Sequence, residues 1–311
     1  MENNLNNRKI AIFTDAHALL EPTQAALEDM HRRGITEIYS LGDNIGVGPN
    51  PGEVIDLLEE YGVKSLAGNS EEYTTLGIEP FKVYFNSSKT QSQFWTISKL
   101  NEYQKKNIAI WPHSIELLIG GKKIALCHFA NDVRFDYRLN STWSYQDKIN
   151  NHQAGCKQFL YTNSDEQLNY MHKMIEKYGK DKPFMRGFVS ALDEFASKKV
   201  DFFDAIIQGH VHWKIYESSP STDFYSIRAV GMAYGKDPID TASYVILSEK
   251  TNDYDLKEIL VKYDREKMEY NILNSDMPDQ TIKRFVNLSS SENSDLGKQL
   301  VLSKKPLPLF R

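Results

Sequence analysis

The first 67 residues alternate short apolar runs with longer segments of helical spacing. KIAIF (9–13) is typical of a buried strand, and residues 22–34 have helical spacing that ends at a glycine. A second strand (37–41), a second helix (51–62) and a third strand (63–67) follow. Because this strand–helix order implies parallel strands joined by crossover helices, we predict an α/β fold.

The rest of the chain adds one helix and more strands. Residues 86–107 are predicted to form a single helix, and residues 114–129 a hairpin around Gly120–Gly121, since paired glycines permit the positive φ of a tight turn. Strand patterns return between 204 and 248 in DAIIQG, KIYES, FYSIRAVG and SYVILS, and again at 255–264. Residues 265–286 are predicted to be helical at both ends, with a break at Pro278.

Two segments do not follow this pattern. Residues 131–200 are polar and rich in Asn, Lys and aromatic residues, and we predict that they form a cap or lid inserted into a main domain spanning 1–286. Residues 287–311 are rich in Ser, Lys and Pro, which predicts a flexible C-terminal tail.

Composition excludes several classes of function. The net charge of −5 argues against nucleic acid as the main partner, since such binders usually carry a basic face. No run approaches the roughly 18–20 apolar residues of a membrane span, and the polar start lacks the apolar core of a secretory signal. With only two cysteines, Cys127 and Cys156, a disulfide-stabilised secreted scaffold is disfavoured. We therefore predict a cytoplasmic protein; the sequence does not indicate its oligomeric state.

Five of the predicted strands are followed directly by side chains that bind metal ions. These are Asp15 and His17 after KIAIF, Asp43 after EIYSL, Asn69 after VKSLA, His128 after KIALC, and His210 and His212 after DAIIQ. The carboxyl ends of strands line the active-site crevice of an α/β sheet. Two carboxylates, one amide and four imidazoles form a mixed oxygen and nitrogen set that suits Mn, Fe, Zn or Co.

Each of these motifs alone has an ordinary structural interpretation. Asp-x-His at a strand end can be a turn or a helix N-cap, and Gly-Asp and Gly-Asn are common turn dipeptides. A single His128 can be a hydrogen-bonded histidine of the core. Five such motifs at five strand ends favour a shared metal site over five separate structural roles.

In this order, Asp-x-His, Gly-Asp, Gly-Asn, His and Gly-His-x-His resemble the signature of the calcineurin-like metallophosphoesterases. The resemblance runs from about Lys9 to Val286. GDNIGVGPNP (42–51), Trp111-Pro112 before the Gly-Gly hairpin, and residues 228–247 and 277–285 are similar to the small prokaryotic branch of that family. The resemblance implies two facing mixed β-sheets flanked by helices, the αββα sandwich, with 131–200 as the inserted cap.

The resemblance also implies two adjacent divalent metal ions, with manganese favoured, that Asp43 bridges. One ion would also bind Asp15, His17 and His212, and the other Asn69, His128 and His210. Water between the metals would become hydroxide near neutral pH and attack phosphorus in line, while the metals neutralise the phosphoryl oxygens. No catalytic residue beyond this hydroxide is assigned.

The chain departs from the family pattern after Asn69. Many members have a histidine there that protonates the leaving oxygen, whereas this chain has Ser70, which has no useful pKa for that task. Either the leaving group needs little protonation, which we prefer, or another residue supplies the proton. Arg134 is a candidate for gripping a phosphate bidentately, although a surface role is an equal alternative. Glu71 and Glu72 are assigned no role.

These observations favour metal-dependent hydrolysis of a small phosphodiester, nucleotide or dinucleoside polyphosphate. A haloacid-dehalogenase-type phosphatase is disfavoured because it needs Asp-x-Asp where this chain has Asp15 and His17. An amidohydrolase is disfavoured because it places His-x-His at the first strand, not late in the chain. The alternative is a catalytically silent member of the superfamily that acts as a protein-binding scaffold. Loss of catalysis normally removes ligands first, and here all seven positions keep a competent residue.

Overall fold

The computed structural model describes residues 8–78, 87–129, 203–232 and 240–283. Within these ranges, ten strands form two mixed sheets of five strands each. Sheet A has the order β10 (Asp253–Lys262), β9 (Thr241–Lys250), β1 (Lys9–Phe13), β2 (Glu37–Ser40) and β3 (Lys64–Ser65). Sheet B has the order β4 (Ser114–Ile119), β5 (Lys122–Cys127), β6 (Ala205–Gln208), β8 (Asp223–Ser226) and β7 (Ile215–Ser218).

The strands that lead to the candidate ligands are parallel within each sheet. β1 pairs in parallel with β2, and β2 with β3, whereas β9 joins the other side of β1 in antiparallel register. In sheet B, β5 pairs in parallel with β6, and β6 with β8. The carboxyl ends of β1, β2 and β3 therefore meet at one edge of sheet A, and those of β5 and β6 meet at one edge of sheet B.

Alternation of side chains along β1 explains how the sheets pack. Ile10 and Ile12 lie in the core between the two sheets, where they meet residues of sheet B such as Leu126 and Ile207. The intervening residues, Ala11 and Phe13, belong to the core on the other face of sheet A, beneath the helices. Because both faces of β1 are buried, the strand reads as a continuous apolar run.

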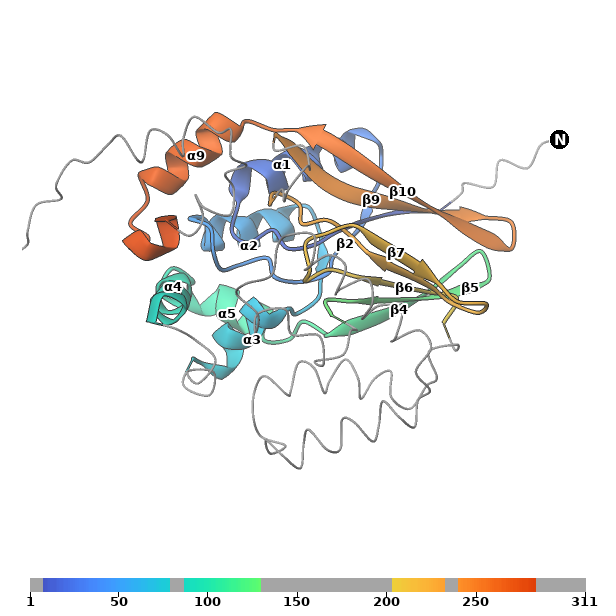
Figure 1. Cartoon of the computed structure of the whole chain (residues 1–311), viewed down its shortest axis with the longest axis horizontal. Coiled ribbons are helices and arrows are strands. Elements are labelled where there is room, and N and C mark those ends of the chain that lie inside the picture. Colours follow the sequence, from blue (N-terminus) through green and yellow to red (C-terminus); the bar gives the residue numbers. More distant parts are fainter. Residues whose placement is uncertain (1–7, 79–86, 130–202, 233–239, 284–311) are drawn as a thin grey trace, which may run out of the picture.

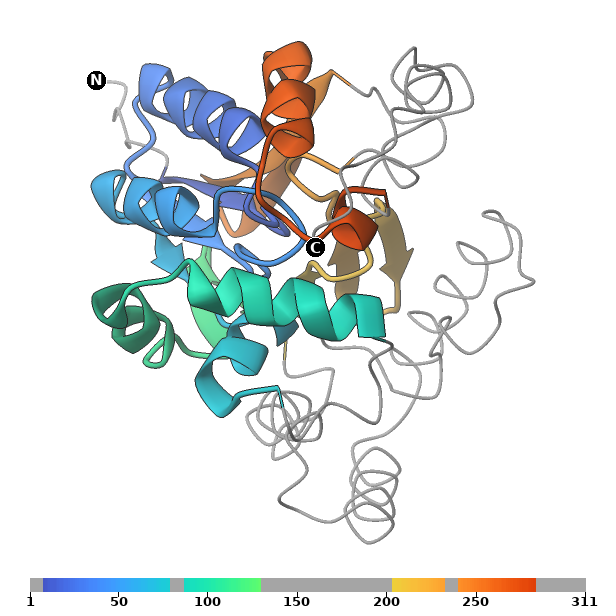
Figure 2. The same cartoon turned by 90° about the vertical axis from the view of Figure 1, so that its left-hand side faces the viewer.

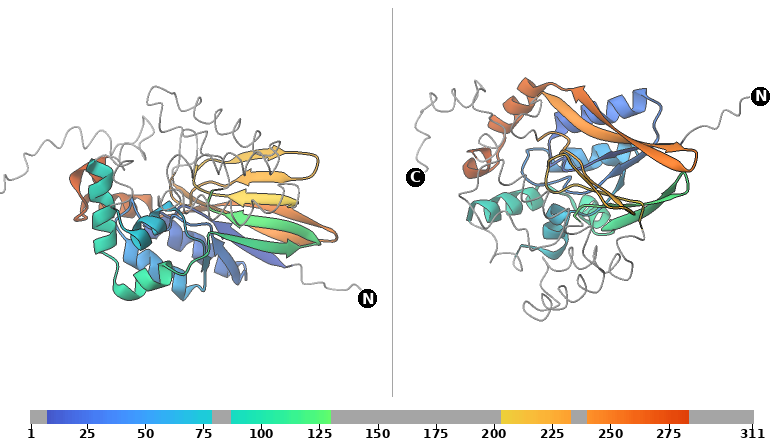
Figure 3. Two further views of the ribbon diagram at one scale, coloured as in Figure 1. Left: turned by 90° about the horizontal axis from the view of Figure 1, so that it is seen from below. Right: turned by 45° about the vertical axis from the view of Figure 1, so that its right-hand side comes forward.

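The helices gather on the outer face of sheet A and at one end of the strands (Figures 1 and 2). They are α1 (Leu20–Arg32), α2 (Pro51–Glu60), α3 (Asn69–Leu76), α4 (Ser87–Ser98), α5 (Glu102–Ile108) and α9 (Arg265–Leu273). The β9–β10 and β4–β5 hairpins project from the opposite end, as both views of Figure 3 show. This arrangement is the predicted α/β sandwich of two facing mixed sheets. Among the described residues, no helix has both the length and the apolar character needed to cross a membrane.

The prediction of one helix over residues 86–107 is wrong, because the structure has α4 and α5 there with a break at 99–101. Asn101 caps α5: its side chain accepts a hydrogen bond from the backbone N–H of Gln104 at 2.9 Å, and Gln104 Oε1 accepts one from the N–H of Asn101 at 3.0 Å. This reciprocal capping box starts a new helix in a new direction. The predicted cap (131–200) and tail (287–311) lie outside the described residues.

Candidate metal centre

The seven side chains predicted to bind metal all lie just beyond the ends of strands, and most of them have a positive backbone φ angle. Among the described non-glycine residues, eight have positive φ, and five of these are predicted ligands: Asp15, His17, Asp43, His210 and His212. A side chain disfavours this left-handed region, so such conformations persist only where the surroundings hold them, and they cluster at functional sites. The strained turns therefore mark this edge of the sandwich as the functional region.

Hydrogen bonds between turns keep this backbone in place. The N–H of Asp15 donates to the carbonyl of Gly42 at 2.9 Å, and the N–H of His17 donates to the carbonyl of Asp43 at 2.9 Å. The N–H of His210 donates to Oδ2 of Asp15 at 2.9 Å, which ties a turn of sheet B to a turn of sheet A. The two sheets thus share one set of turn contacts at their carboxyl ends.

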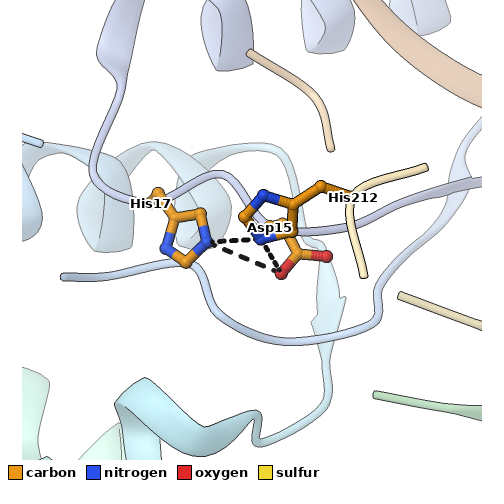
Figure 4. Close-up of side chains that lie close together, drawn as sticks. All are labelled: Asp15, His17 and His212. Carbon is orange, nitrogen blue, oxygen red and sulfur yellow. Dashed lines mark hydrogen bonds and ion pairs between the residues drawn. The ribbon is translucent and has the colours of Figure 1, made fainter. Parts of the chain in front are cut away.

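Asp15, His17 and His212 form the first group of donors. Nε2 of His17 lies 3.0 Å from Nε2 of His212, and Oδ1 of Asp15 lies 3.1 Å from the His212 nitrogen and 3.6 Å from the His17 nitrogen. Figure 4 shows the two rings turning these nitrogens toward each other and toward the carboxylate. Three donor atoms from two sheets therefore face one common point.

The protonation states in this group suit metal binding. Burial and the neighbouring His212 lower the pKa of His17 to about 4, so its imidazole is neutral near pH 7. Burial alone would raise the pKa of Asp15, but the nearby imidazoles, His212 foremost, hold that pKa far below its usual range. A neutral imidazole and an ionised carboxylate are the forms that ligate a divalent cation.

Asp43, His128 and His210 form the second group, with Asn69 beside them. Nε2 of His128 lies 3.1 Å from Nδ1 of His210, 3.3 Å from Oδ1 of Asn69 and 3.6 Å from Oδ1 of Asp43. The other ring nitrogen of His128, Nδ1, lies 3.1 Å from the backbone carbonyl of Leu41. Because that carbonyl can only accept, Nδ1 carries the proton and Nε2 turns its lone pair toward the other donors.

Electrostatics reinforce this second group. Burial would lower the pKa of His128, but the carboxylates of Asp43, Asp15 and Glu71 outweigh it and raise the pKa. The surrounding negative charge thus favours a positive charge at this ring, either a proton or a cation bound at Nε2. A concentration of buried carboxylates at one place is costly unless cations offset it.

Asp43 lies between the two groups. Its Oδ1 faces His128 of the second group at 3.6 Å, and its Oδ2 lies 4.0 Å from Nε2 of His17 in the first. Each carboxylate oxygen thus turns toward a different set of imidazoles. Within each group of three His and Asp residues, the ligand atoms lie within 4.8 Å of one another.

The residues present fit divalent metal ions. Asp15 is fully buried, yet no described residue makes a hydrogen bond to its Oδ1, and Nδ1 of the buried His17 likewise lacks a partner within the described ranges. Buried polar atoms are normally satisfied, so a carboxylate oxygen whose close neighbours among the described residues are two imidazole nitrogens can accept a further binding partner. A cation coordinated by all three side chains is such a partner.

Two glycines are required for this close approach. A Cβ on Gly68 would lie 2.5 Å from both the backbone nitrogen and Oδ1 of Asp43, and 3.0 Å from Nδ1 of His128. A Cβ on Gly209 would collide with the side chain of Thr14 and come within 2.8 Å of Oδ2 of Asp15. Any larger residue at either position would push a predicted ligand out of place.

Glu71 is a residue of this region to which the sequence assigned no role. Its buried carboxylate accepts hydrogen bonds from the backbone N–H groups of Asp43, Asn44 and Gly68, each at 2.8 Å. Burial and the neighbouring Asp43 raise its pKa to about 7. An available signal was its place at the third position of α3, where a carboxylate commonly binds free backbone N–H groups.

Two other predictions have different outcomes. Ser70 is 2% exposed, and its backbone N–H donates to Oδ1 of Asp43 at 2.7 Å, so this position supports a predicted ligand through its main chain. Arg134 lies outside the described residues, and its role in holding phosphate stays a prediction.

Comparisons with known proteins identify the family of the chain. The family model described as calcineurin-like phosphoesterase matches residues 8–214, which is more than half of the chain. The uncharacterized protein MJ0912 of Methanocaldococcus jannaschii is 28% identical over 277 residues, covering 87% of this chain and 94% of that protein.

Two solved structures share the fold. Hypothetical protein PH1004 from Pyrococcus horikoshii matches with a TM-score of 0.59 and 15% identity, over 89% of this chain and 97% of that one. A metallophosphoesterase from Sphaerobacter thermophilus matches with a TM-score of 0.54 and 19% identity, over 91% of this chain and 99% of that one.

The chain belongs to the calcineurin-like phosphoesterase family. Membership implies a hydrolase that uses divalent metal ions, and the described residues contain two groups of suitable ligands. The family match ends at Lys214, two residues after His212, whereas the resemblance predicted from the motifs runs on to Val286.

Proposed function

We propose that this chain hydrolyses a small phosphate ester or anhydride with two divalent metal ions. One ion would bind Asp15, His17 and His212, the other Asn69, His128 and His210, and Asp43 would bridge them. One observation carries the proposal: the two oxygens of Asp43 face two separate sets of imidazoles, Oδ1 toward His128 and Oδ2 toward His17.

The chemistry of the ligands supports particular ions. Carboxylate, amide and imidazole ligands together suit Mn, Fe, Zn or Co, and we favour manganese. When bound, such ions lower the pKa of water and offset the negative charge on phosphoryl oxygens. The protein's contribution is to hold the imidazoles and carboxylates in fixed directions. The hydrogen bond from His128 to the Leu41 carbonyl and the turn contacts of Asp15 do this.

We propose a small substrate whose leaving group needs little protonation. Ser70 stands where many family members have a histidine, and a buried serine hydroxyl has no pKa suited to donating a proton. When a phosphoanhydride of a nucleotide or dinucleoside polyphosphate is cleaved, the leaving group is a nucleotide phosphate, which needs little protonation. The leaving group of an activated phosphodiester meets the same condition. The net charge of −5 favours such a substrate over a nucleic-acid polymer. A cytoplasmic location stays a prediction from cysteine content.

Hydrolysis assays with defined metals test the proposal. Purified protein would be stripped with a chelator and assayed with and without Mn²⁺ on bis-p-nitrophenyl phosphate, p-nitrophenyl phosphate and a panel of nucleotides and dinucleoside polyphosphates. We expect Mn²⁺ to restore hydrolysis of the diester or of an anhydride. Absence of metal-stimulated release on every substrate, with no bound metal by elemental analysis, would leave the protein-binding scaffold as the better account.

A pair of matched variants links the activity to the site. Asp43→Asn keeps the shape of the side chain but removes the charge that would bridge the metals, so we expect activity to fall at least 100-fold, or about 2.7 kcal/mol. Asp255→Asn makes the same change on β10, away from the candidate metal centre. Within the described residues, the half-exposed carboxylate of Asp255 forms an ion pair with Lys250. We expect this control to retain wild-type activity.

A further inference from the structure

Glu71 connects the two turns that carry Asp43 and Asn69. Its Oε2 accepts hydrogen bonds from the backbone N–H groups of Asp43 and Gly68, and its Oε1 accepts one from Asn44, all at 2.8 Å. Gly68 immediately precedes Asn69. One buried carboxylate thus ties the loop after β2 to the turn after β3.

The contact between Asp43 and the start of α3 is reciprocal. The N–H of Ser70 donates to Oδ1 of Asp43 at 2.7 Å, while the N–H of Asp43 donates to Glu71. The helix therefore holds both the main chain and the side chain of Asp43. This matters because Asp43 has φ of 53°, in the left-handed region that is uncommon for residues other than glycine and that these hydrogen bonds help to hold.

Both oxygens of Glu71 are occupied by N–H groups, so the carboxylate is not a further ligand. Its two oxygens accept three charge-assisted hydrogen bonds in a site that solvent does not reach. Its position thus serves the ligands rather than the reacting atoms.

We propose that Glu71 is a positioning residue for the second metal ion, the one assigned to Asn69, His128, His210 and Asp43. This inference rests on the proposed function. It makes a specific claim: loss of the Glu71 carboxylate weakens the second ion more than the first. Asp43 serves both ions, but Asn69 and the Asp43 Oδ1 that faces His128 belong to the second ion alone. The first group depends on turns after β1 and β6, and the hydrogen bonds of Glu71 to Asp43, Asn44 and Gly68 do not reach these turns directly. Their link to Glu71 runs through the carbonyls of Gly42 and Asp43.

Glu71→Gln is the direct test, with Glu72→Gln as its matched control. The amide places an NH₂ where a carboxylate oxygen accepted hydrogen bonds, so at least one backbone N–H loses its acceptor. Glu72 is the next residue of the same helix and is also buried, but no described residue donates a hydrogen bond to its Oε1. The same substitution there changes no backbone contact to Asp43 or Gly68.

Cobalt(II) titration of metal-free protein, followed by visible absorption, measures both ions without requiring activity. For Glu71→Gln we expect the first ion to bind within about threefold of wild type and the second to bind 10- to 100-fold more weakly. Glu72→Gln is expected to bind both ions as wild type does. If Glu71→Gln binds both ions as tightly as wild type does, or if Glu72→Gln loses as much affinity for the second ion as Glu71→Gln does, the inference is overturned.

Two further outcomes keep this test separate from that of the proposed function. If wild type itself binds no cobalt, the proposed function fails and the inference fails with it; if wild type binds two ions and Glu71→Gln binds both equally well, only the inference fails.

Should Glu71→Gln not fold, amide hydrogen exchange in metal-free wild type tests the role of Glu71 instead. We expect the N–H groups of Asp43, Asn44 and Gly68 to exchange at least 100-fold more slowly than in an unfolded chain. Free exchange of all three would refute the role of Glu71.

Discussion

Nε2 of His17 and Nε2 of His212 lie 3.0 Å apart, although 195 positions separate the two residues in the sequence. Two imidazole nitrogens can share one proton at most, and Oδ1 of Asp15 lies 3.1 Å from the His212 nitrogen and 3.6 Å from the His17 nitrogen. A divalent cation satisfies all three atoms together. The contact between these histidines is thus the simplest sign that the two sheets meet around a metal.

Metal binding is expected to stabilise the folded chain. A ligand that binds only the native state adds about 2.7 kcal/mol at a concentration 100 times its Kd. We therefore expect Mn²⁺ to raise the Tm of chelator-treated protein by several degrees, measured by scanning calorimetry. Asp15→Asn should lose most of this rise, whereas the surface change Asp255→Asn should keep it. An unchanged Tm in wild type at millimolar Mn²⁺ would count against metal binding.

Gly68 is predicted to tolerate no side chain. Its added Cβ would lie 2.5 Å from two atoms of Asp43, so Gly68→Ala must displace a predicted ligand or the turn that carries it. We expect a loss of about 2 kcal/mol or more in unfolding free energy, as for other overpacked buried sites, together with loss of the second metal ion. Chemical denaturation and elemental analysis measure the two effects.

Gly52→Ala is the control for Gly68→Ala. Gly52 lies in α2, and its added Cβ would come no nearer than 3.3 Å to the side-chain amide of Gln104 and 3.5 Å to the backbone carbonyl of Lys99. Alanine is the better helix former, so we expect a change within about 1 kcal/mol and full metal binding. Similar losses in both variants would show that the effect at Gly68 is not specific to the site.

Acid should weaken the contact between Glu37 and Arg8. The guanidinium of Arg8 donates to both carboxylate oxygens at 2.8 Å and lowers the pKa of Glu37 to about 2, from an ordinary value of 4.5. Since the folded pKa lies below the unfolded one, the stabilisation is complete above pH 4.5 and is lost as pH falls toward 2.

Glu37→Gln measures this effect. At pH 7 we expect the variant to be less stable by roughly 0.5–1 kcal/mol, because water screens this partly exposed pair. The difference from wild type in urea denaturation should shrink as the pH falls below 4.5. A difference that stays constant from pH 7 to pH 3 would contradict the assignment.

The hydroxyl of Tyr254 joins the two sheets at a distance from the metal centre. It donates to Oδ2 of Asp223 at 2.8 Å, from β10 of sheet A to β8 of sheet B. Tyr254→Phe should lower the unfolding free energy by about 1.5–3 kcal/mol, the range for a hydrogen bond to a charged group, without changing metal binding. Tyr270→Phe, at a 66% exposed position, should have no measurable effect on urea denaturation.

Arg134 remains a predicted phosphate contact that kinetics can test. If it grips the substrate equally in the ground and transition states, Arg134→Ala should raise KM about tenfold and leave kcat almost unchanged. Arg138→Ala is the matched control, since the sequence favours a surface role for Arg138. Unchanged kinetics in Arg134→Ala would remove that residue from the site.

The sequence allowed the seven clustered side chains to be predicted because each follows a strand with a clear apolar run. The break between α4 and α5 was not predicted. The residue types of Asn101 and Gln104 permit a capping box, but the hydrogen bonds between them, which start α5, are seen only in the structure. The role of Glu71 was predictable only in part. Its place at the third position of α3 indicates a local bond to the N–H of Gly68, but its other partners, the N–H groups of Asp43 and Asn44, lie more than 25 positions away.

The most direct test of the account is a crystal structure of the protein grown with Mn²⁺, with anomalous scattering recorded to locate the metal. We predict two manganese peaks about 3.5–4 Å apart with Asp43 between them, one beside His17 and His212 and the other beside His128 and His210. A map with no manganese at these side chains, or with the imidazoles turned away from Asp15 and Asp43, would contradict the account.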